Sequence, residues 1–235
     1  MSKHLFPAIT FTNYGYIHYT KNLIGSIAQN DINLDLRVFC IDDESENDLT
    51  KMSVKVERFE NQFLKSDKLV RWDDKDFGAM MLYKFEMIYK YLLLHDSVLY
   101  LDSDIVIKKN IEDYLYKNLE NKDILFQNDT NPRYPNKQTV CAGFMHIKSN
   151  RKTLKFFNPE NLNMEKIMNY TFHDQTHINK NKSKFRLGLL PLNEFSSGIH
   201  FYNNFGNYSP AMIHFNYVVG NKKIETIKKY GEWYV

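Results

Sequence analysis

The chain has 235 residues and a formal net charge of +3, with 43% hydrophobic and 25% charged residues. This composition is that of a globular protein, and it excludes a disordered chain, a collagen and a small disulfide-held scaffold. The net charge is too small to indicate a nucleic-acid partner, which would require a dense basic face. The length predicts a single domain over residues 1–235.

The sequence shows no targeting segment. Residues 1–7 lack the long apolar core of a signal peptide, and the longest apolar stretch, residues 89–101, is interrupted by polar and charged side chains. A membrane span needs roughly 18 apolar residues. We therefore expect a soluble, cytoplasmic protein with no membrane span. Cys40 and Cys141 are expected to be two buried, reduced thiols.

The hydrophobic pattern predicts strands that alternate with helices. The expected elements are a strand at 8–12, a helix at 18–29, strands at 34–41 and 54–59, a helix at 77–94 and a strand at 97–101. The second half is less regular, with strands at 123–126 and 144–147 on either side of a polar loop at 128–138. This alternation predicts an α/β fold, a Rossmann-like α/β/α sandwich around a mostly parallel central sheet.

Polar clusters follow three of the predicted strands. They are Thr12-Asn13, Asp42-Asp43 and Asp102-Ser103-Asp104. Parallel α/β sheets bind their ligands at the carboxyl ends of the strands. The three clusters therefore indicate one binding site.

Asp102 and Asp104 are the strongest chemical signal in the chain. Residues two apart on an extended segment point to the same side, so the two carboxylates repel each other unless a cation lies between them. Oxygen ligands of this kind suit Mg²⁺ or Mn²⁺, and such an ion typically holds a diphosphate. A solvated turn is the plainer alternative.

An Asp-X-Asp after a strand is also typical of phosphatases of the haloacid-dehalogenase type, in which Asp102 would be the nucleophile. Two observations weigh against that interpretation. About 100 residues precede the motif, whereas it usually follows the first strand, and the late acidic Gly-Asp motif is missing downstream.

Eight segments form an ordered set along the chain, at residues 11–16, 39–43, 82–88, 98–106, 141–145, 173–179, 214–223 and 230–233. They contain the Asp-Ser-Asp motif, an Asp-Gln pair and a closing His-Phe-Asn. Taken together and in order, they resemble the nucleotide-diphospho-sugar transferase family of GT-A glycosyltransferases, which includes plant cell-wall xylosyltransferases and is related to the glycogenin and galactosyltransferase families. Cys141 stands where the family usually has Asn, which leaves the identity of the donor open.

The resemblance implies a GT-A fold with a donor half at residues 1–104 and an acceptor half with the closing motif at 105–235. It implies a cation held by Asp102, Asp104 and His214, and an imidazole ligand favours Mn²⁺ over Mg²⁺. The implied nucleotide-binding residues are Thr12, Asn13, Tyr16, Asp42, Lys84, Asp102, Ser103 and either or both of Lys222 and Lys223. The implied sugar-binding residues are Gly143, Asp174 and Gln175.

Asp174 and Gln175 are also the implied catalytic residues. Because an amide is a poor nucleophile, the resemblance implies a front-side displacement that retains the anomeric configuration. Asp174 is expected to be the N-cap of a helix as well. The resulting hypothesis is a metal-dependent, retaining transferase that moves a sugar from a nucleotide diphosphate, UDP first among them, to a hydroxyl of a glycan or glycoprotein. A non-catalytic nucleotide- or carbohydrate-binding module is the second alternative.

Overall fold

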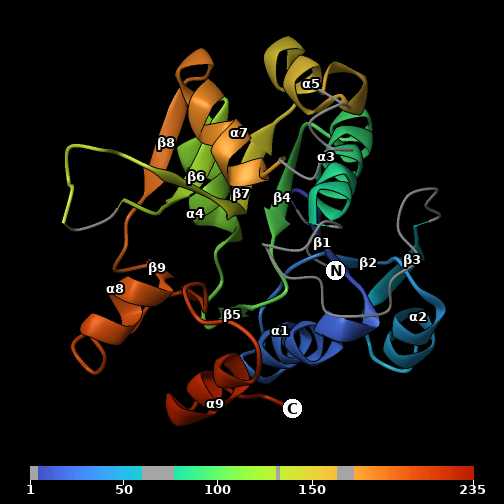
Figure 1. The fold of residues 1–235 in the computed structure, drawn as a ribbon, viewed down its shortest axis with the longest axis vertical. Coiled ribbons are helices and arrows are strands. Elements are labelled where there is room, and N and C mark those ends of the chain that lie inside the picture. Colours follow the sequence, from blue (N-terminus) through green and yellow to red (C-terminus); the bar gives the residue numbers. More distant parts are fainter. Residues whose placement is uncertain (1–4, 60–76, 131–132, 163–171) are drawn as a thin grey trace.

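The computed structural model describes residues 5–59, 77–130, 133–162 and 172–235. Within these ranges a seven-stranded sheet has the order β3-β2-β1-β4-β7-β6-β8 (Figure 1). Its strands are β1 (Ala8–Thr12), β2 (Leu36–Cys40), β3 (Lys55–Arg58), β4 (Ser97–Leu101), β6 (Ile124–Asn128), β7 (Val140–Lys148) and β8 (Leu187–Leu190).

Most pairings in this sheet are parallel, as the sequence predicts. β1 pairs in parallel with β2 and β4, β2 with β3, and β6 with β8, whereas β7 runs antiparallel to both β4 and β6. Residues 129–139 connect β6 to β7, and those of them that the structure describes contain no helix. Parallel neighbours would need a crossover connection, usually a helix, whereas antiparallel neighbours do not. β7 is longer than the strand predicted at 144–147, so Cys141 and Gly143 lie within a strand.

Helices cover both faces of the sheet. On one face α3 (Phe77–Leu94), α5 (Arg151–Phe157) and α7 (Asp174–Asn181) share a buried cluster with Val98 and Tyr100 of β4. On the other face α1 (Ile17–Gln29), α2 (Asp43–Leu49) and α4 (Glu112–Leu119) share a second cluster with Leu99 and Leu101. Successive residues of β4 therefore enter opposite layers, which is why the strand is apolar throughout. The predicted sandwich and the predicted helix at 77–94 are confirmed.

A smaller sheet, which the sequence did not predict, lies beside the large one. It consists of β5 (Ile105–Ile107), β10 (Met212–His214) and β9 (Phe195–Ser197). β10 runs antiparallel to β5 and parallel to β9. A third buried cluster, which includes Tyr19, Phe215 and Ile227, joins this sheet to α1, α8 (Gly198–Asn203) and α9 (Asn221–Lys229). Figure 1 shows α9, near the C-terminus, beside α1.

The expected burial of the two cysteines is confirmed. Cys40 and Cys141 are both buried and unpaired. Among the described residues, no helix combines the length and the apolar character that crossing a bilayer demands.

Candidate active site

A cavity of about 570 Å³ opens where β1 and β4 end at the carboxyl edge of the large sheet. Its walls come from both ends of the chain, including the turn after β1, the Asp-Ser-Asp turn, the first half of β7, the start of α7 and the segment after β10. Of the residues that the sequence indicates for the site, the lining contains Thr12, Asn13, Tyr16, Lys84, Asp102, Ser103, Asp104, Gly143, Asp174, Gln175, His214 and Lys223.

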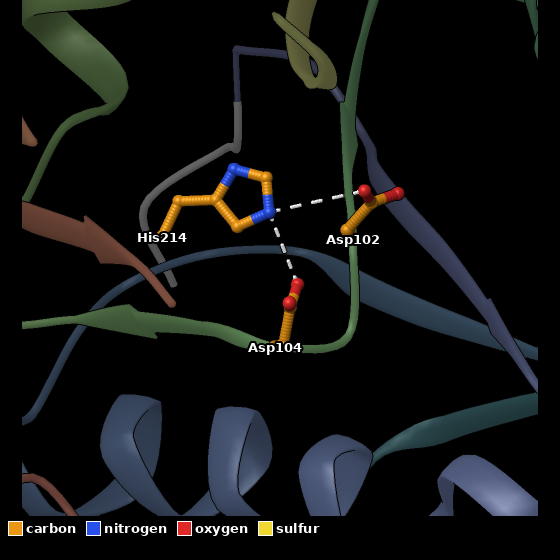
Figure 2. A group of neighbouring side chains, drawn as sticks. All are labelled: Asp102, Asp104 and His214. Atoms are coloured by element: carbon orange, nitrogen blue, oxygen red, sulfur yellow. Dashed lines mark ion pairs between the residues drawn. The ribbon is translucent and has the colours of Figure 1, made fainter. Parts of the chain in front are cut away.

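Asp102, Asp104 and His214 form one cluster on this lining. Asp102 follows β4, Asp104 directly precedes β5, and His214 is the last residue of β10, paired with Ile105 of β5. His214 Nε2 lies 3.1 Å from Asp104 Oδ1 and 3.9 Å from Asp102 Oδ2 (Figure 2). One ligand atom from each residue lies within 4.8 Å of the others. The small sheet therefore brings a histidine from the end of the chain onto the acidic motif.

The donor set of this cluster fits a divalent cation. Two carboxylates and one imidazole suit Mn²⁺, and also Mg²⁺ to the extent that oxygen ligands dominate. Gly143 keeps the space beside the carboxylates open, because a Cβ on Gly143 would lie 2.5 Å from Asp102 Oδ2 and would also collide with the His214 ring. The donor chemistry and the glycine are therefore consistent with a metal site.

The charges of the cluster are strongly coupled. Burial alone would raise the pKa of the Asp104 carboxyl, but Lys223 and His214 together lower it well below its usual value. Burial alone would lower the pKa of His214, but Asp104 raises it well above the ordinary histidine value. Lys223 Nζ also forms an ion pair with Asp104. Positive groups of the chain thus already surround the Asp104 carboxylate.

Lys84 is a buried ammonium between two acidic groups. Its side chain is 3% exposed, and its Nζ lies 2.5 Å from Asp174 Oδ2 and 3.3 Å from Asp102 Oδ1. Nζ also donates to the carbonyl of Ala142 at 3.4 Å. Burial alone would lower the pKa of Lys84, but Asp102 and Asp174 raise it above its ordinary value, so the ammonium stays charged. Lys84 therefore links the acidic motif to the start of α7.

Gln175 is held by two partners at the start of α7. Its Oε1 accepts a hydrogen bond from the Ala142 backbone N–H at 3.2 Å, and its Nε2 donates to Asp129 Oδ2 at 2.9 Å. The expected N-cap role of Asp174 is wrong, because His173 is the N-cap residue and Asp174 is the first residue of the helix. There its carboxylate is favoured by the positive end of the helix dipole.

Asp129 is a cavity residue that the sequence analysis missed. It directly follows β6, and its other oxygen, Oδ1, accepts a hydrogen bond from Tyr217 Oη at 2.6 Å. Its position in the sequence could have revealed it, because Asp102 was recognised as an acidic residue that directly follows a buried strand, and Asp129 follows β6 in the same way. Tyr217 was also missed, although it lies three residues after His214 in the closing motif.

Two of the expected nucleotide-binding residues do not lie on the cavity lining described by the structure. Asp42 caps α2, where its Oδ1 accepts from Ser45 N and its Oδ2 from Tyr14 N, each at 2.7 Å. Lys222 is exposed, whereas Lys223 lines the cavity. Of the two neighbouring lysines, the structure therefore directs Lys223 to the site.

The large sheet, its two helical layers and the cavity at its carboxyl edge are those of a GT-A type α/β fold. The chain belongs to the nucleotide-diphospho-sugar transferase family, whose sequence profile matches residues 35–227. It is 23% identical to the UDP-galactose:fucoside alpha-3-galactosyltransferase of Dictyostelium discoideum, in an alignment that covers 97% of this chain and 43% of that protein. The chain thus spans less than half the length of this curated relative.

Solved structures show the same fold. The galactosyltransferase LgtC, crystallised with donor and acceptor sugar analogues, matches with a TM-score of 0.62 at 11% identity, covering 98% of this chain and 97% of that chain. Mouse xyloside xylosyltransferase 1 matches with a TM-score of 0.51 at 11% identity, covering 90% of this chain and 98% of that chain. These similarities confirm the expected GT-A fold.

Proposed function

We propose that this chain is a metal-dependent, retaining glycosyltransferase that moves a sugar from a UDP-sugar to a hydroxyl of a glycan or glycoprotein. The observation that carries the proposal is the convergence, in a member of this family, of the Asp102/Asp104/His214 cluster, two lysines and the Asp174-Gln175 pair on one cavity. The proposed donor and acceptor halves, residues 1–104 and 105–235, both contribute walls to it.

One side of the cavity suits a nucleoside diphosphate. Asp102, Asp104 and His214 would hold Mn²⁺ or Mg²⁺, and a bound divalent cation neutralises charge that develops on a leaving diphosphate. Lys223 adjoins the cluster, and its ammonium would exchange its ion pair with Asp104 for one with the diphosphate. The nucleoside would lie against Thr12, Asn13, Tyr16 and Ser103, which line the cavity beyond the metal cluster. Asp42 does not line the cavity and would support the nucleoside site indirectly, because its carboxylate accepts a hydrogen bond from the backbone N–H of Tyr14.

The other side suits the transferred sugar. Asp174 and Gln175 would contact the sugar, with Gly143 leaving room beside the carboxylates and Lys84 fixing the Asp174 carboxylate. In the proposed front-side displacement, the bond between the anomeric carbon and the diphosphate oxygen breaks, and the acceptor oxygen bonds to the same face. The acceptor proton passes to the departing diphosphate oxygen. Gln175 orients the reacting groups and forms no covalent bond.

A panel of UDP-sugars tests the proposal, with UDP-galactose first because the Dictyostelium relative is named for that donor. We expect slow hydrolysis of at least one donor in the presence of Mn²⁺. Asp104→Ala should abolish the reaction, whereas Asp113→Ala, an exposed acid on α4, should not change it. Thermal unfolding of both variants shows whether the fold is retained.

The other outcomes identify the two alternatives. UDP binding without turnover of any sugar would favour a binding module. Release of phosphate from an aryl phosphate that depends on Asp102 would favour the phosphatase interpretation, which family membership already makes the weaker one. If no nucleotide sugar binds or reacts with either Mn²⁺ or Mg²⁺, the proposed activity is refuted.

A further inference from the structure

Gln127 is a fully buried polar side chain directly behind the proposed metal ligand His214. It lies on β6 of the large sheet and is 0% exposed. Its Oε1 is 2.8 Å from His214 Nδ1, on the side of the imidazole ring opposite the acidic cluster. Its Nε2 donates to the carbonyl of Ser196 at 2.8 Å and approaches that of Phe195 at 3.5 Å.

These contacts fix the orientation of the Gln127 amide. Carbonyl oxygens accept hydrogen bonds and donate none, so the NH₂ group must face Ser196 and Phe195. A flipped amide would place two acceptor oxygens 2.8 Å apart and would leave the buried NH₂ facing the imidazole. The Oε1 atom therefore faces His214, and it can only accept.

The orientation of the amide in turn fixes the proton on His214. Because Gln127 Oε1 is an acceptor 2.8 Å away, Nδ1 must carry a hydrogen and donate it. Nε2 lies 3.1 Å from Asp104 Oδ1, and a carboxylate oxygen can only accept, so Nε2 also carries a hydrogen when no cation is bound. A cation at Nε2 would replace that hydrogen, and the neutral ring would keep its single N–H on Nδ1.

We propose that Gln127 is a positioning residue that holds His214 in the Nδ1-protonated tautomer and so presents the Nε2 lone pair to a cation bound by Asp102 and Asp104. Outer partners of this kind commonly fix the ring orientation and tautomer of metal-binding histidines. The inference rests on the metal site in the proposed function.

Cys141 gives this role a specific consequence. Its Sγ lies 3.5 Å from the same Nδ1 and accepts a hydrogen bond from Gly143 N at 3.3 Å. A thiol can donate as well as accept. Without Gln127, the S–H group can donate to Nδ1 and favour the tautomer with its proton on Nε2. Gln127 therefore keeps Nδ1 of His214 a donor to its own Oε1 and prevents it from accepting a hydrogen bond from Cys141.

The test compares two replacements of Gln127 by Mn²⁺ titration of the nucleotide-free protein, followed by the electron paramagnetic resonance signal of free Mn²⁺. Gln127→Met keeps the length of the side chain but removes both polar atoms. Gln127→Glu keeps an acceptor oxygen for Nδ1–H. We expect the Met variant to bind Mn²⁺ about 10- to 100-fold more weakly than the wild type, and the Glu variant to recover most of that loss.

A purely structural role is separated by a control and by thermal unfolding. Thr153→Val removes a hydrogen bond made by another fully buried side chain, from Thr153 Oγ1 to the Lys148 carbonyl, outside the cavity lining. It should lower the unfolding temperature and leave the Mn²⁺ affinity unchanged. Equal Mn²⁺ affinity in the wild type and a folded Gln127→Met variant would overturn the inference and leave the proposed function standing. A wild type that binds no Mn²⁺ would also overturn the inference, whereas the proposed function is decided separately by the UDP-sugar assays.

Discussion

Replacing Lys84 by Met should destabilise the protein strongly, because it removes the ammonium that balances two acidic groups. The Lys84 side chain is 3% exposed and that of its partner Asp174 is 8% exposed. Asp102 keeps a hydrogen bond from Tyr100 Oη at 2.7 Å, but Asp174 loses the Lys84 ammonium that lies 2.5 Å from its carboxylate. Breaking a buried pair by removing one partner typically costs about 3–5 kcal/mol.

That cost is a large part of the 5–15 kcal/mol by which proteins of this kind are typically stable. Urea unfolding of the wild type, Lys84→Met, Asp174→Asn and the double variant measures it. The Asn substitution removes the unbalanced charge, so the double variant should be more stable than Lys84→Met alone. We expect a coupling free energy of about 2 kcal/mol or more between the two sites.

Lys90→Met is the matched control, since Lys90 lies on the same helix and is exposed. Its free energy of unfolding should differ from that of the wild type by about 0.5 kcal/mol or less. A loss of under about 1 kcal/mol in Lys84→Met, or strict additivity in the double variant, would refute the argument that Lys84 and Asp174 form one buried pair.

Three further predictions concern single substitutions. Gly143→Ala should weaken Mn²⁺ binding about 5- to 150-fold in a calorimetric titration. The new Cβ would displace the Asp102 carboxylate, at a strain of about 1–3 kcal/mol. Unchanged affinity would contradict this. Asp129→Leu should lower kcat about 100-fold without changing the Kd for UDP, because the Gln175 amide loses its acceptor, while Asp129→Asn should retain most activity. Burial lowers the pKa of His146 to about 3, so the native state holds it neutral and stability is lost as pH falls below about 6.5. Between pH 7.5 and 5.5 the wild type should lose about 1.4 kcal/mol more than His146→Leu in urea unfolding, and parallel pH profiles would disprove the assignment.

The parts of the fold that the sequence predicted are those with a strong local pattern. β4 reads as a buried strand because both of its faces are covered, and α3 reads as a long apolar helix. The small sheet escaped prediction because each of its strands has only three residues, too few to show a period. Its pairing also joins Ile105 to His214, which lie far apart in the sequence.

In the site, too, the residues with a local sequence signal were predicted and those defined by tertiary contacts were not. Asp102 and Asp104 were found because they follow a clear strand, and His214 was found through the family motif. Gln127 gave no such signal, since an amide at the end of an apolar strand looks like an ordinary edge residue. Its importance depends on the Ser196 carbonyl and the His214 ring, which only the tertiary structure brings to it.

The antiparallel course of β7 has a consequence for how sites of this kind can diversify. Because β7 lies between β4 and β6, residues 141–143 form a cavity wall from the interior of a sheet, and Gly143 O accepts from Asp102 N at 2.7 Å. An inserted or deleted residue there would shift the strand by one position and reverse every side chain beyond it. This wall can change only by exchange of side chains, whereas the segment after β10 can also change in length. The two walls of the cavity would thus diversify by different kinds of mutation.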